Sequence, residues 1–241
     1  MPLPLKRRIE KGLGSLFDPL YFAYLLAVDL KSCRYFPEWF SSFRLGRALL
    51  GEAKPWIPFA AANWLQHYLK PNMKVFEYGS GGSTIFFAER VAEVTSVEHD
   101  KQWHKRVSQA LAHRGVTNCS YQLHEPIPLA GAFSAVDHSE SSQFIIDDYY
   151  AATLHEYVQA IDVQPDDSFD LVFVDGRVRT QCIQHAIPKI RRRGYLMLDN
   201  SDNADVAEIV GRLRPYSHRT FRSIAPGWPP ARWTNTIWQI T

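Results

Sequence analysis

Short strand-like segments alternate with helical segments from residue 74 to residue 213, and this alternation constrains the fold more than any other feature. Runs rich in β-branched and aromatic residues predict five strands, at residues 74–78, 93–98, 120–124, 169–175 and 195–199. Helical patterns follow each of them, at residues 83–91, 101–113, 153–161, 181–191 and 205–213. Parallel strands need long crossover connections, which helices of this length provide. The pattern therefore predicts a parallel sheet that is covered by helices on both faces.

The end of the chain breaks this alternation. Two strand-like runs, at residues 218–224 and 234–240, have no helix between them, and their connector APGWPPAR is rich in proline and glycine. Such a connector favours an antiparallel hairpin. We therefore predict an α/β protein with a Rossmann-like, doubly wound and mostly parallel sheet that ends in a C-terminal antiparallel hairpin.

The first 70 residues are rich in helical patterns and aromatic side chains, so we expect an N-terminal helical extension or cap over residues 1–70 and a ligand-binding domain over residues 71–241. The apolar run LYFAYLLAV, at residues 20–28, follows a basic segment and mimics part of a signal peptide. It is too short to span a bilayer. We expect a helix that is buried, or that contacts a partner or membrane surface through residues 20–30.

Composition narrows the class of protein. The chain has 241 residues, 46% of them hydrophobic, which is enough for a sizeable core. Its net charge of +2 does not favour binding to nucleic acid or acidic lipid. Three cysteines lie far apart and predict neither a disulfide framework nor a metal site, so a reducing, cytoplasmic location is expected. The sequence does not predict an oligomeric state.

A glycine turn joins the first predicted strand to the first helix, in the segment VFEYGSGGST at residues 75–84. A dinucleotide-binding fingerprint has glycines at the first, third and sixth positions of this turn. Here Gly79 and Gly81 occupy the first and third positions, but Thr84 occupies the sixth. Glu77 lies just before the turn, where a carboxylate would repel a pyrophosphate but favour an ammonium or sulfonium group.

A second acid supports the same interpretation. Glu98 ends the second predicted strand, about 20 residues past the turn, where an acidic residue accepts hydrogen bonds from ribose hydroxyls. With Glu77 it indicates an adenosine-type ligand that carries positive groups and no phosphates. S-adenosylmethionine fits that description.

With these motifs in this order, the sequence resembles the class I S-adenosylmethionine-dependent methyltransferases over residues 73–241. FEYGSGGST is similar to their first motif, SVEHD to the acidic second-strand motif, and FDLVFVDGR and GYLMLDNSD to the fourth and fifth strands. The resemblance implies that Glu98 binds the ribose hydroxyls and that His99 lies near the adenine. The other candidate cofactor-binding residues are Glu77, Gly79, Ser80, Gly81, Ser83 and Glu125.

Ligands of open α/β sheets bind at the carboxyl ends of the strands, where several polar residues are expected to gather. Asp175 follows the most apolar strand, and Arg177 and Arg179 add cations that would bind an anionic substrate or orient a carboxylate. We take Asp175 and Arg177 as candidate catalytic residues, with a helix-capping role as the alternative for Asp175. Further candidate bases are His99, His124, Tyr149 and Tyr150.

A metal site is a further hypothesis for this edge. Asp175, Asp199 and Asn200 offer oxygen ligands at neighbouring strand ends, and hard divalent cations prefer oxygen. Their spacing resembles the cation-dependent O-methyltransferases, in which matching residues bind a magnesium-like ion that lowers the pKa of the substrate hydroxyl. The sequence departs from that pattern at Val178, where the catalytic lysine of the catechol enzymes would fall. Magnesium is therefore a candidate cofactor, and helix capping is the alternative for Asp199 and Asn200.

The segment at residues 125–152 is long for a connection within a compact domain, and such loops often cover binding sites. We expect it to cover the acceptor site together with the N-terminal helices. Its serine-rich middle also fits a disordered surface loop.

Three functions remain open from the sequence. The first is methyl transfer from S-adenosylmethionine to a small-molecule acceptor, at oxygen by resemblance, with no nucleic-acid substrate expected. The second is a nicotinamide-dependent oxidoreductase on the same fold, against which Glu77 and Thr84 argue. The third is a non-catalytic module that binds a partner or a membrane surface through residues 20–30.

Overall fold

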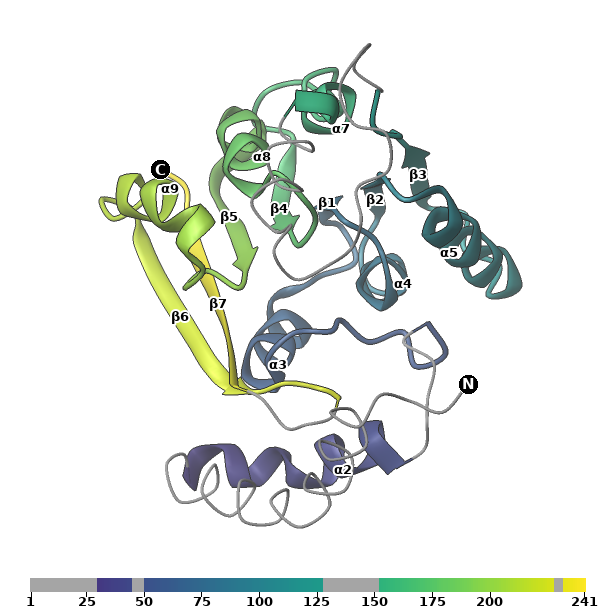
Figure 1. Cartoon of the computed structure of the whole chain (residues 1–241), viewed down its shortest axis with the longest axis vertical. Helices are drawn as coiled ribbons and strands as arrows, with labels where there is room; N and C mark the ends of the chain where they lie inside the picture. The colour runs from purple at the N-terminus through teal and green to yellow at the C-terminus, as the bar shows by residue number, and fades with distance from the viewer. Residues whose placement is uncertain (1–29, 45–49, 128–151, 228–231) are drawn as a thin grey trace, which may run out of the picture.

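A seven-stranded sheet forms the centre of the protein in the computed structural model, which describes residues 30–44, 50–127, 152–227 and 232–241 (Figure 1). The strand order is β3-β2-β1-β4-β5-β7-β6. The strands are β1 (Lys74–Tyr78), β2 (Glu93–Glu98), β3 (Cys119–Leu123), β4 (Phe169–Val174), β5 (Ile190–Asp199), β6 (Ser217–Ile224) and β7 (Arg232–Gln239). The first five pair in parallel, whereas β7 pairs antiparallel with both β5 and β6.

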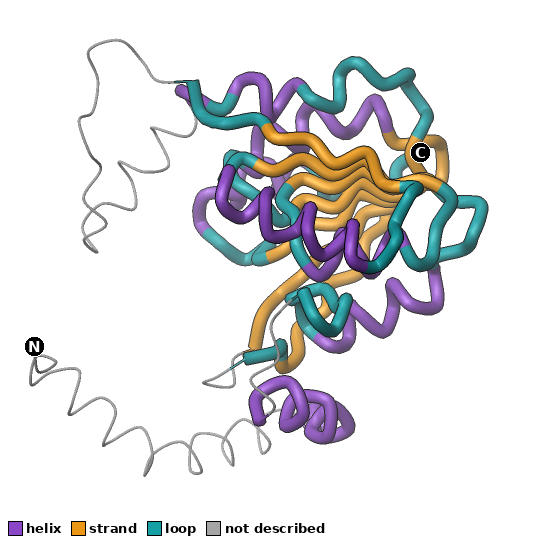
Figure 2. The backbone as a smooth tube through the Cα atoms, turned by 90° about the vertical axis from the view of Figure 1, so that its right-hand side faces the viewer, coloured by secondary structure: helices purple, strands orange, loops and turns teal. Residues whose placement is uncertain are grey.

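Helices lie on both sides of the twisted sheet (Figure 2). The α-helices are α2 (Phe36–Arg44), α3 (Phe59–Tyr68), α4 (Gly82–Ala88), α5 (Lys101–His113), α7 (His155–Gln159), α8 (Arg179–Ala186) and α9 (Ala207–Arg212). Shorter 3-10 turns are η1 (Leu30–Tyr35), η3 (Ile187–Lys189) and η4 (Ala204–Val206). The predicted fold class, with its parallel sheet and terminal hairpin, is confirmed.

The two faces of the sheet bury alternate residues of the same strands. On β4, Val172 and Val174 pack in one core with α7, α8 and α9, whereas Leu171 and Phe173 pack in the other with α3 and α4. Helix α5 packs beside α4 through Val107 and its neighbours. All six residues of β4 are buried, because side chains alternate between two covered faces.

One boundary differs clearly from the prediction. The helical pattern was expected to continue to residue 191, but α8 ends at Ala186 and β5 begins at Ile190, five residues before the expected strand. The three arginines after Ile190 are exposed strand residues. The local sequence around these arginines favours a helix. Pairing of Ile190 with Phe169 of β4, a contact distant in sequence, places them in a strand instead.

The described N-terminal segments pack on the sheet. In α3, Leu65 is fully buried in the same core as Phe221 of β6. Helix α2 lies at the end of the hairpin, where Trp39 packs with Ile224 and donates a 3.0 Å hydrogen bond from Nε1 to the Gly227 carbonyl (Figure 1). The division into an extension over residues 1–70 and a domain over residues 71–241 stays a prediction.

Several predictions concern residues outside the described ranges, namely the apolar run at 20–28, most of the expected covering loop, Tyr149 and Tyr150. Within the described ranges, none of the helices combines the length and apolarity needed to cross a membrane. The three cysteines, Cys33, Cys119 and Cys182, are free thiols.

Candidate functional site

The carboxyl ends of β1 and β4 meet where the strand order reverses, and this is the place where open α/β sheets bind ligands. The Asp175 amide donates a 2.9 Å hydrogen bond to the Tyr78 carbonyl, which joins the two exits. On the other side, the Gly79 amide donates to the Val97 carbonyl of β2 at 2.9 Å. Three strand ends are thus held together under the glycine turn.

Gly79 begins the turn in a conformation that other residues rarely adopt. Its φ is +84°, and a Cβ there would lie 2.8 Å from the backbone of Asp175 and Gly176. Both the dihedral angle and the close approach therefore require glycine. Gly81 differs, because its φ of 169° is extended and a Cβ would meet only Trp103, at 3.8 Å.

Glu77 is fully buried beneath the turn. Its Oε2 accepts hydrogen bonds from the hydroxyls of Thr84 and Ser96, both at 2.6 Å. Thr84 Oγ1 also accepts the Gly81 amide at 2.9 Å. Glu77 therefore connects β1, β2 and the first turn of α4, and so orders the loop from below.

Burial raises the pKa of Glu77 to about 7, although the nearby hydroxyls of Ser83, Ser96 and Thr84 oppose the rise. The negative charge of Glu98 adds to it. Near neutral pH the side chain is therefore part protonated, and a cationic ligand above the loop would favour its charged form.

Glu98, at the end of β2, is also buried, but its carboxylate is saturated with hydrogen bonds. Oε2 accepts from the amide and the hydroxyl of Ser80, at 3.1 and 2.7 Å. Oε1 accepts from the amides of His99 and Asp100, at 2.8 and 2.9 Å. A ribose hydroxyl would have to compete with these donors for the Glu98 carboxylate.

These hydrogen bonds outweigh desolvation at Glu98. Burial acts to raise the pKa, but bonds from His99, Asp100 and Ser80 lower it to about 2. Glu98 is thus a fixed negative charge at neutral pH, next to a Glu77 that titrates.

The other residues predicted to bind the cofactor differ in burial and in their distance from the glycine turn. Ser83 is buried in the first turn of α4, and His99 lies against Glu98, with Nδ1 2.9 Å from Oε1. Ser80 is tied down further by Trp103, whose Nε1 donates to its carbonyl at 2.7 Å. Glu125 is exposed and pairs with Lys101 at 3.0 Å, so it does not join the buried acids.

Asp175, Asp199 and Asn200 do come together at the strand ends, but Arg179 lies among them. Its guanidinium donates to the carbonyls of Gly176 and Asp199 and to Asn200 Oδ1. It also lies 3.4 Å from Asp175 Oδ1 and 3.8 Å from Asp199 Oδ2. The side chain is only 15% exposed.

The predicted magnesium site is therefore not supported. The three oxygen donors surround a guanidinium that already supplies a positive charge. Within the described residues no group of three histidine, cysteine, aspartate or glutamate side chains could hold a metal ion. The N–H groups of an arginine form charge-assisted hydrogen bonds with carboxylate and carbonyl oxygens, and Arg179 contacts these oxygens in that way.

The two aspartates influence each other's protonation. Burial, with the charge of Asp199 next, raises the pKa of Asp175 well above its usual range, while Arg179 opposes the rise. Burial also raises the pKa of Asp199. The pair therefore retains a proton at pH values where isolated aspartates are charged. The Asp175 side chain is 25% exposed, so solvent or a substrate can reach it.

The structure assigns the two arginines of this segment to different environments. Arg177 is exposed, whereas Arg179 is turned inward onto the acids. Sequence spacing could not separate them, because both lie within four residues of Asp175 and the predicted helix began only at residue 181. Val178 between them is the N-cap of α8 and has a left-handed conformation, with a φ of +47°.

Three polar residues near the site were not among the predicted site residues. Thr84 was noted in the sequence only as the residue that replaces the third glycine, and Ser96 could have been noticed as a hydroxyl inside an apolar strand. Tyr157 of α7 is fully buried and packs its ring 5.8 Å from that of His99. Nothing in its local sequence marks it.

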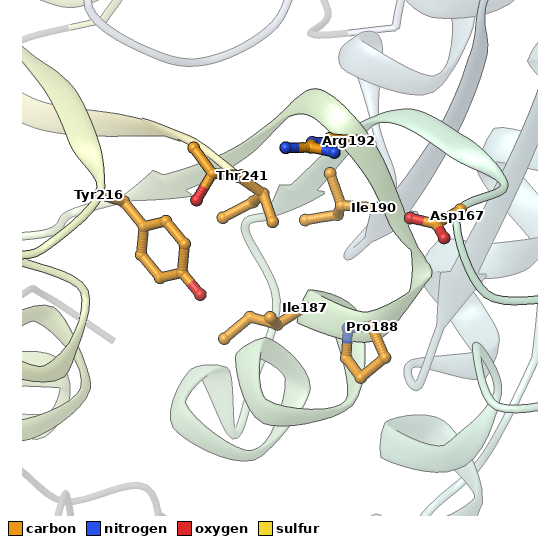
Figure 3. A pocket seen from close by; sticks show the side chains of 8 residues that line it. Asp167, Ile187, Pro188, Ile190, Arg192, Tyr216 and Thr241 are labelled. Atoms are coloured by element: carbon orange, nitrogen blue, oxygen red, sulfur yellow. The ribbon is translucent and has the colours of Figure 1, made fainter.

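A separate open cavity of about 410 Å³ lies at the amino ends of the parallel strands, by the start of β5 (Figure 3). Ile187 and Ile190 form its apolar wall, and Tyr216 faces them across it. Because it adjoins the amino ends of the parallel strands, it is not where this architecture binds its ligand.

No family model and no curated protein matches the sequence. Solved structures do match. An rRNA methylase from Streptococcus thermophilus aligns at 11% identity and a TM-score of 0.50, over 76% of this chain and 95% of that one. A methyltransferase-like protein from Silicibacter pomeroyi aligns at 22% identity and a TM-score of 0.50, over 76% of this chain and 87% of that one. With the strand order, terminal hairpin and glycine turn, these likenesses show that the chain has the class I S-adenosylmethionine-dependent methyltransferase fold.

Proposed function

We propose that the protein transfers a methyl group from S-adenosylmethionine to a small-molecule acceptor, at oxygen. The observation that carries the proposal is the glycine turn at the strand-order reversal, flanked by the two buried acids Glu77 and Glu98. The shared fold agrees with this activity but would support others as well.

The turn fits the cofactor in shape and charge. Gly79 lets the turn pack directly against the backbone of Asp175 and Gly176, at the strand-order reversal. Glu98 is negatively charged at neutral pH, and Glu77 would become charged there when a bound cation lowers its pKa. This arrangement suits a cationic ligand without phosphates. In the proposed complex Ser80, Gly81, Ser83 and His99 line the same turn, whereas Glu125 remains a peripheral candidate.

S-adenosylmethionine, when bound, supplies a methyl group already activated by the sulfonium. The protein has to align the acceptor and receive its proton, and alignment alone supplies much of the rate. Asp175 is the proposed general base, because its carboxylate is reachable and burial raises its pKa well above the usual range. Arg177, which is exposed beside it, is proposed to contact an anionic part of the acceptor.

Arg179 is proposed to do for the acids what a divalent cation does in the cation-dependent enzymes. Its guanidinium screens Asp175 from Asp199 and fixes both strand ends. We therefore propose that methyl transfer needs no magnesium. The charge is built into the chain, where a chelator cannot remove it.

The small-molecule acceptor is supported by the near-neutral net charge of +2, which offers no long-range attraction to a polyanion. The rRNA methylase named above shares the fold with this chain at 11% identity and does not by itself indicate an RNA substrate. A cytoplasmic location remains a prediction from the cysteine content.

Calorimetric titration of the purified protein with S-adenosylmethionine and, separately, with NAD and NADP tests the cofactor. We expect heat with the first alone, and heat with only a nicotinamide cofactor would overturn the proposal. An acceptor screen that detects S-adenosylhomocysteine, run with chelator and with added magnesium, tests the reaction. Asp175→Asn is expected to lower kcat by about 10²–10⁴ at unchanged cofactor affinity, as for loss of a general base.

A further inference from the structure

The hydroxyl of Tyr157 is buried without a hydrogen-bond partner among the residues that the structure describes. The side chain is fully buried in the core between α7 and the sheet. A buried hydroxyl that lacks a partner costs about 1–3 kcal/mol, so native proteins rarely keep one without a reason.

The hydroxyl lies at the strand-order reversal. A Cβ placed on Gly176, just after β4, would be 1.9 Å from it and 3.1 Å from the Gly79 amide nitrogen. The Tyr157 ring also meets the edge of the His99 ring, 5.8 Å away at the end of β2. The phenol therefore stands between the exits of β1, β2 and β4, where the proposed cofactor would bind.

Its electrostatic neighbours belong to both halves of the site. Burial raises the pKa of Tyr157 well above its usual range, the charge of Glu98 adds to the rise, and Arg179 opposes it. The phenol is therefore neutral at every physiological pH and can donate a hydrogen bond. Glu98 is the acid beside the glycine turn, and Arg179 organises the aspartates, so charges from both parts of the site act on Tyr157.

Tyr78 provides a comparison within the same core. Its ring is 5.5 Å from that of Tyr157, it is equally buried, and its hydroxyl donates a 2.7 Å hydrogen bond to the Val158 carbonyl. Two neighbouring tyrosines thus differ in one respect. The Tyr78 hydroxyl is satisfied within the protein, whereas the Tyr157 hydroxyl lies beside Gly176 without a partner among the described residues.

We propose that Tyr157 is a cofactor-binding residue whose hydroxyl donates a hydrogen bond to the adenosine derivative bound between β1 and β4. The inference rests on the proposed function and adds a residue that no motif identifies. Gly176 is needed for this arrangement, because the side chain of any larger residue there would overlap with the Tyr157 hydroxyl.

The test compares Tyr157→Phe with Tyr78→Phe in the full-length protein, measuring the Kd for S-adenosylmethionine and S-adenosylhomocysteine and the ligand-free melting temperature. Loss of one hydrogen bond corresponds to about a 3- to 10-fold weaker Kd. We expect that loss in Tyr157→Phe for both ligands, with a melting temperature equal to or above that of the wild type. Tyr78→Phe should lower the melting temperature and leave the Kd unchanged.

The outcomes separate the two proposals. If wild-type protein binds neither ligand, the proposed function fails. If it binds both and Tyr157→Phe binds them equally well, only the role of Tyr157 fails. A Tyr157→Phe variant that melts earlier with unchanged Kd would show that the hydroxyl has a partner within the chain, which also overturns the inference.

Discussion

Thr84 donates a 2.6 Å hydrogen bond from its hydroxyl to Oε2 of Glu77, across the first turn of α4. Thr84 stands where a dinucleotide fingerprint places its third glycine, and the same hydroxyl accepts the amide of Gly81. The replacement of the third glycine by Thr84 is therefore linked to the presence of Glu77 before the turn, because the two side chains form a hydrogen bond. A buried carboxylate needs hydrogen-bond donors, and the threonine is one of them.

The raised pKa of Glu77 predicts a stability that falls as pH rises. Its folded-state pKa of about 7 exceeds the ordinary value of 4.5, so the folded protein keeps a proton that the unfolded chain releases. The free energy of unfolding of the wild type, relative to Glu77→Gln, should fall by about 3 kcal/mol between pH 4.5 and pH 7. Urea denaturation at several pH values measures this difference. A difference that stays constant or grows with pH would contradict it.

Glu98 should show the opposite dependence. Its pKa of about 2 lies below the ordinary 4.5, so its contribution is present above pH 4.5 and is lost as pH falls towards 2. The stability advantage of the wild type over Glu98→Gln should shrink by roughly 1.4 kcal/mol per pH unit below 4.5. The same denaturation series, extended to pH 3, tests this expectation. An advantage that persists undiminished at pH 3 would refute the assigned hydrogen-bond network.

Three glycine-to-alanine variants separate strain from steric overlap. Gly79→Ala combines a φ of +84° with a 2.8 Å approach to backbone atoms, so we expect a loss of several kcal/mol. Gly115→Ala has a φ of +65° and open space, so only the left-handed penalty of about 1–2 kcal/mol applies. Gly81→Ala has neither problem and should change stability by less than about 0.5 kcal/mol. Thermal unfolding gives the order, and similar losses for Gly79→Ala and Gly81→Ala would contradict the described turn.

Replacing Arg179 by methionine should be costly, since it leaves two neighbouring acids without their cation. Breaking a buried charge cluster typically costs about 3–5 kcal/mol, and we expect a loss approaching this range. Arg212→Met is the matched control, because the Arg212–Glu208 pair on α9 is exposed and such pairs contribute about 0.5 kcal/mol or less.

Activity supplies the second readout for Arg179. Once an acceptor is found, wild-type turnover should be unaffected by chelator, and the residual turnover of Arg179→Met should not recover with magnesium. Strong inhibition of the wild type by chelator would contradict this expectation and support a metal site.

Local sequence patterns were sufficient where a residue's environment follows from its neighbours along the chain. The bounds of β1 and β2 agree with the sequence prediction, and so do those of α5, whose N-cap Asp100 accepts the Trp103 amide at 2.8 Å. The start of β5 was missed because pairing with β4 is a long-range contact. Strand propensity depends on such partners more than helix propensity does.

In the candidate site, too, some features could be inferred from the sequence and others only from the structure. Alternating strands and helices determine which strand ends share an edge, so the gathering of Glu77, Glu98, Asp175 and Asp199 could be inferred from the sequence by itself. Only the tertiary structure decided that Arg179 lies among the acids and that the Tyr157 hydroxyl stands beside Gly176. The physical reason is that topology follows from hydrophobic periodicity, which is local. The direction and charge state of a side chain depend on burial and on partners from distant segments.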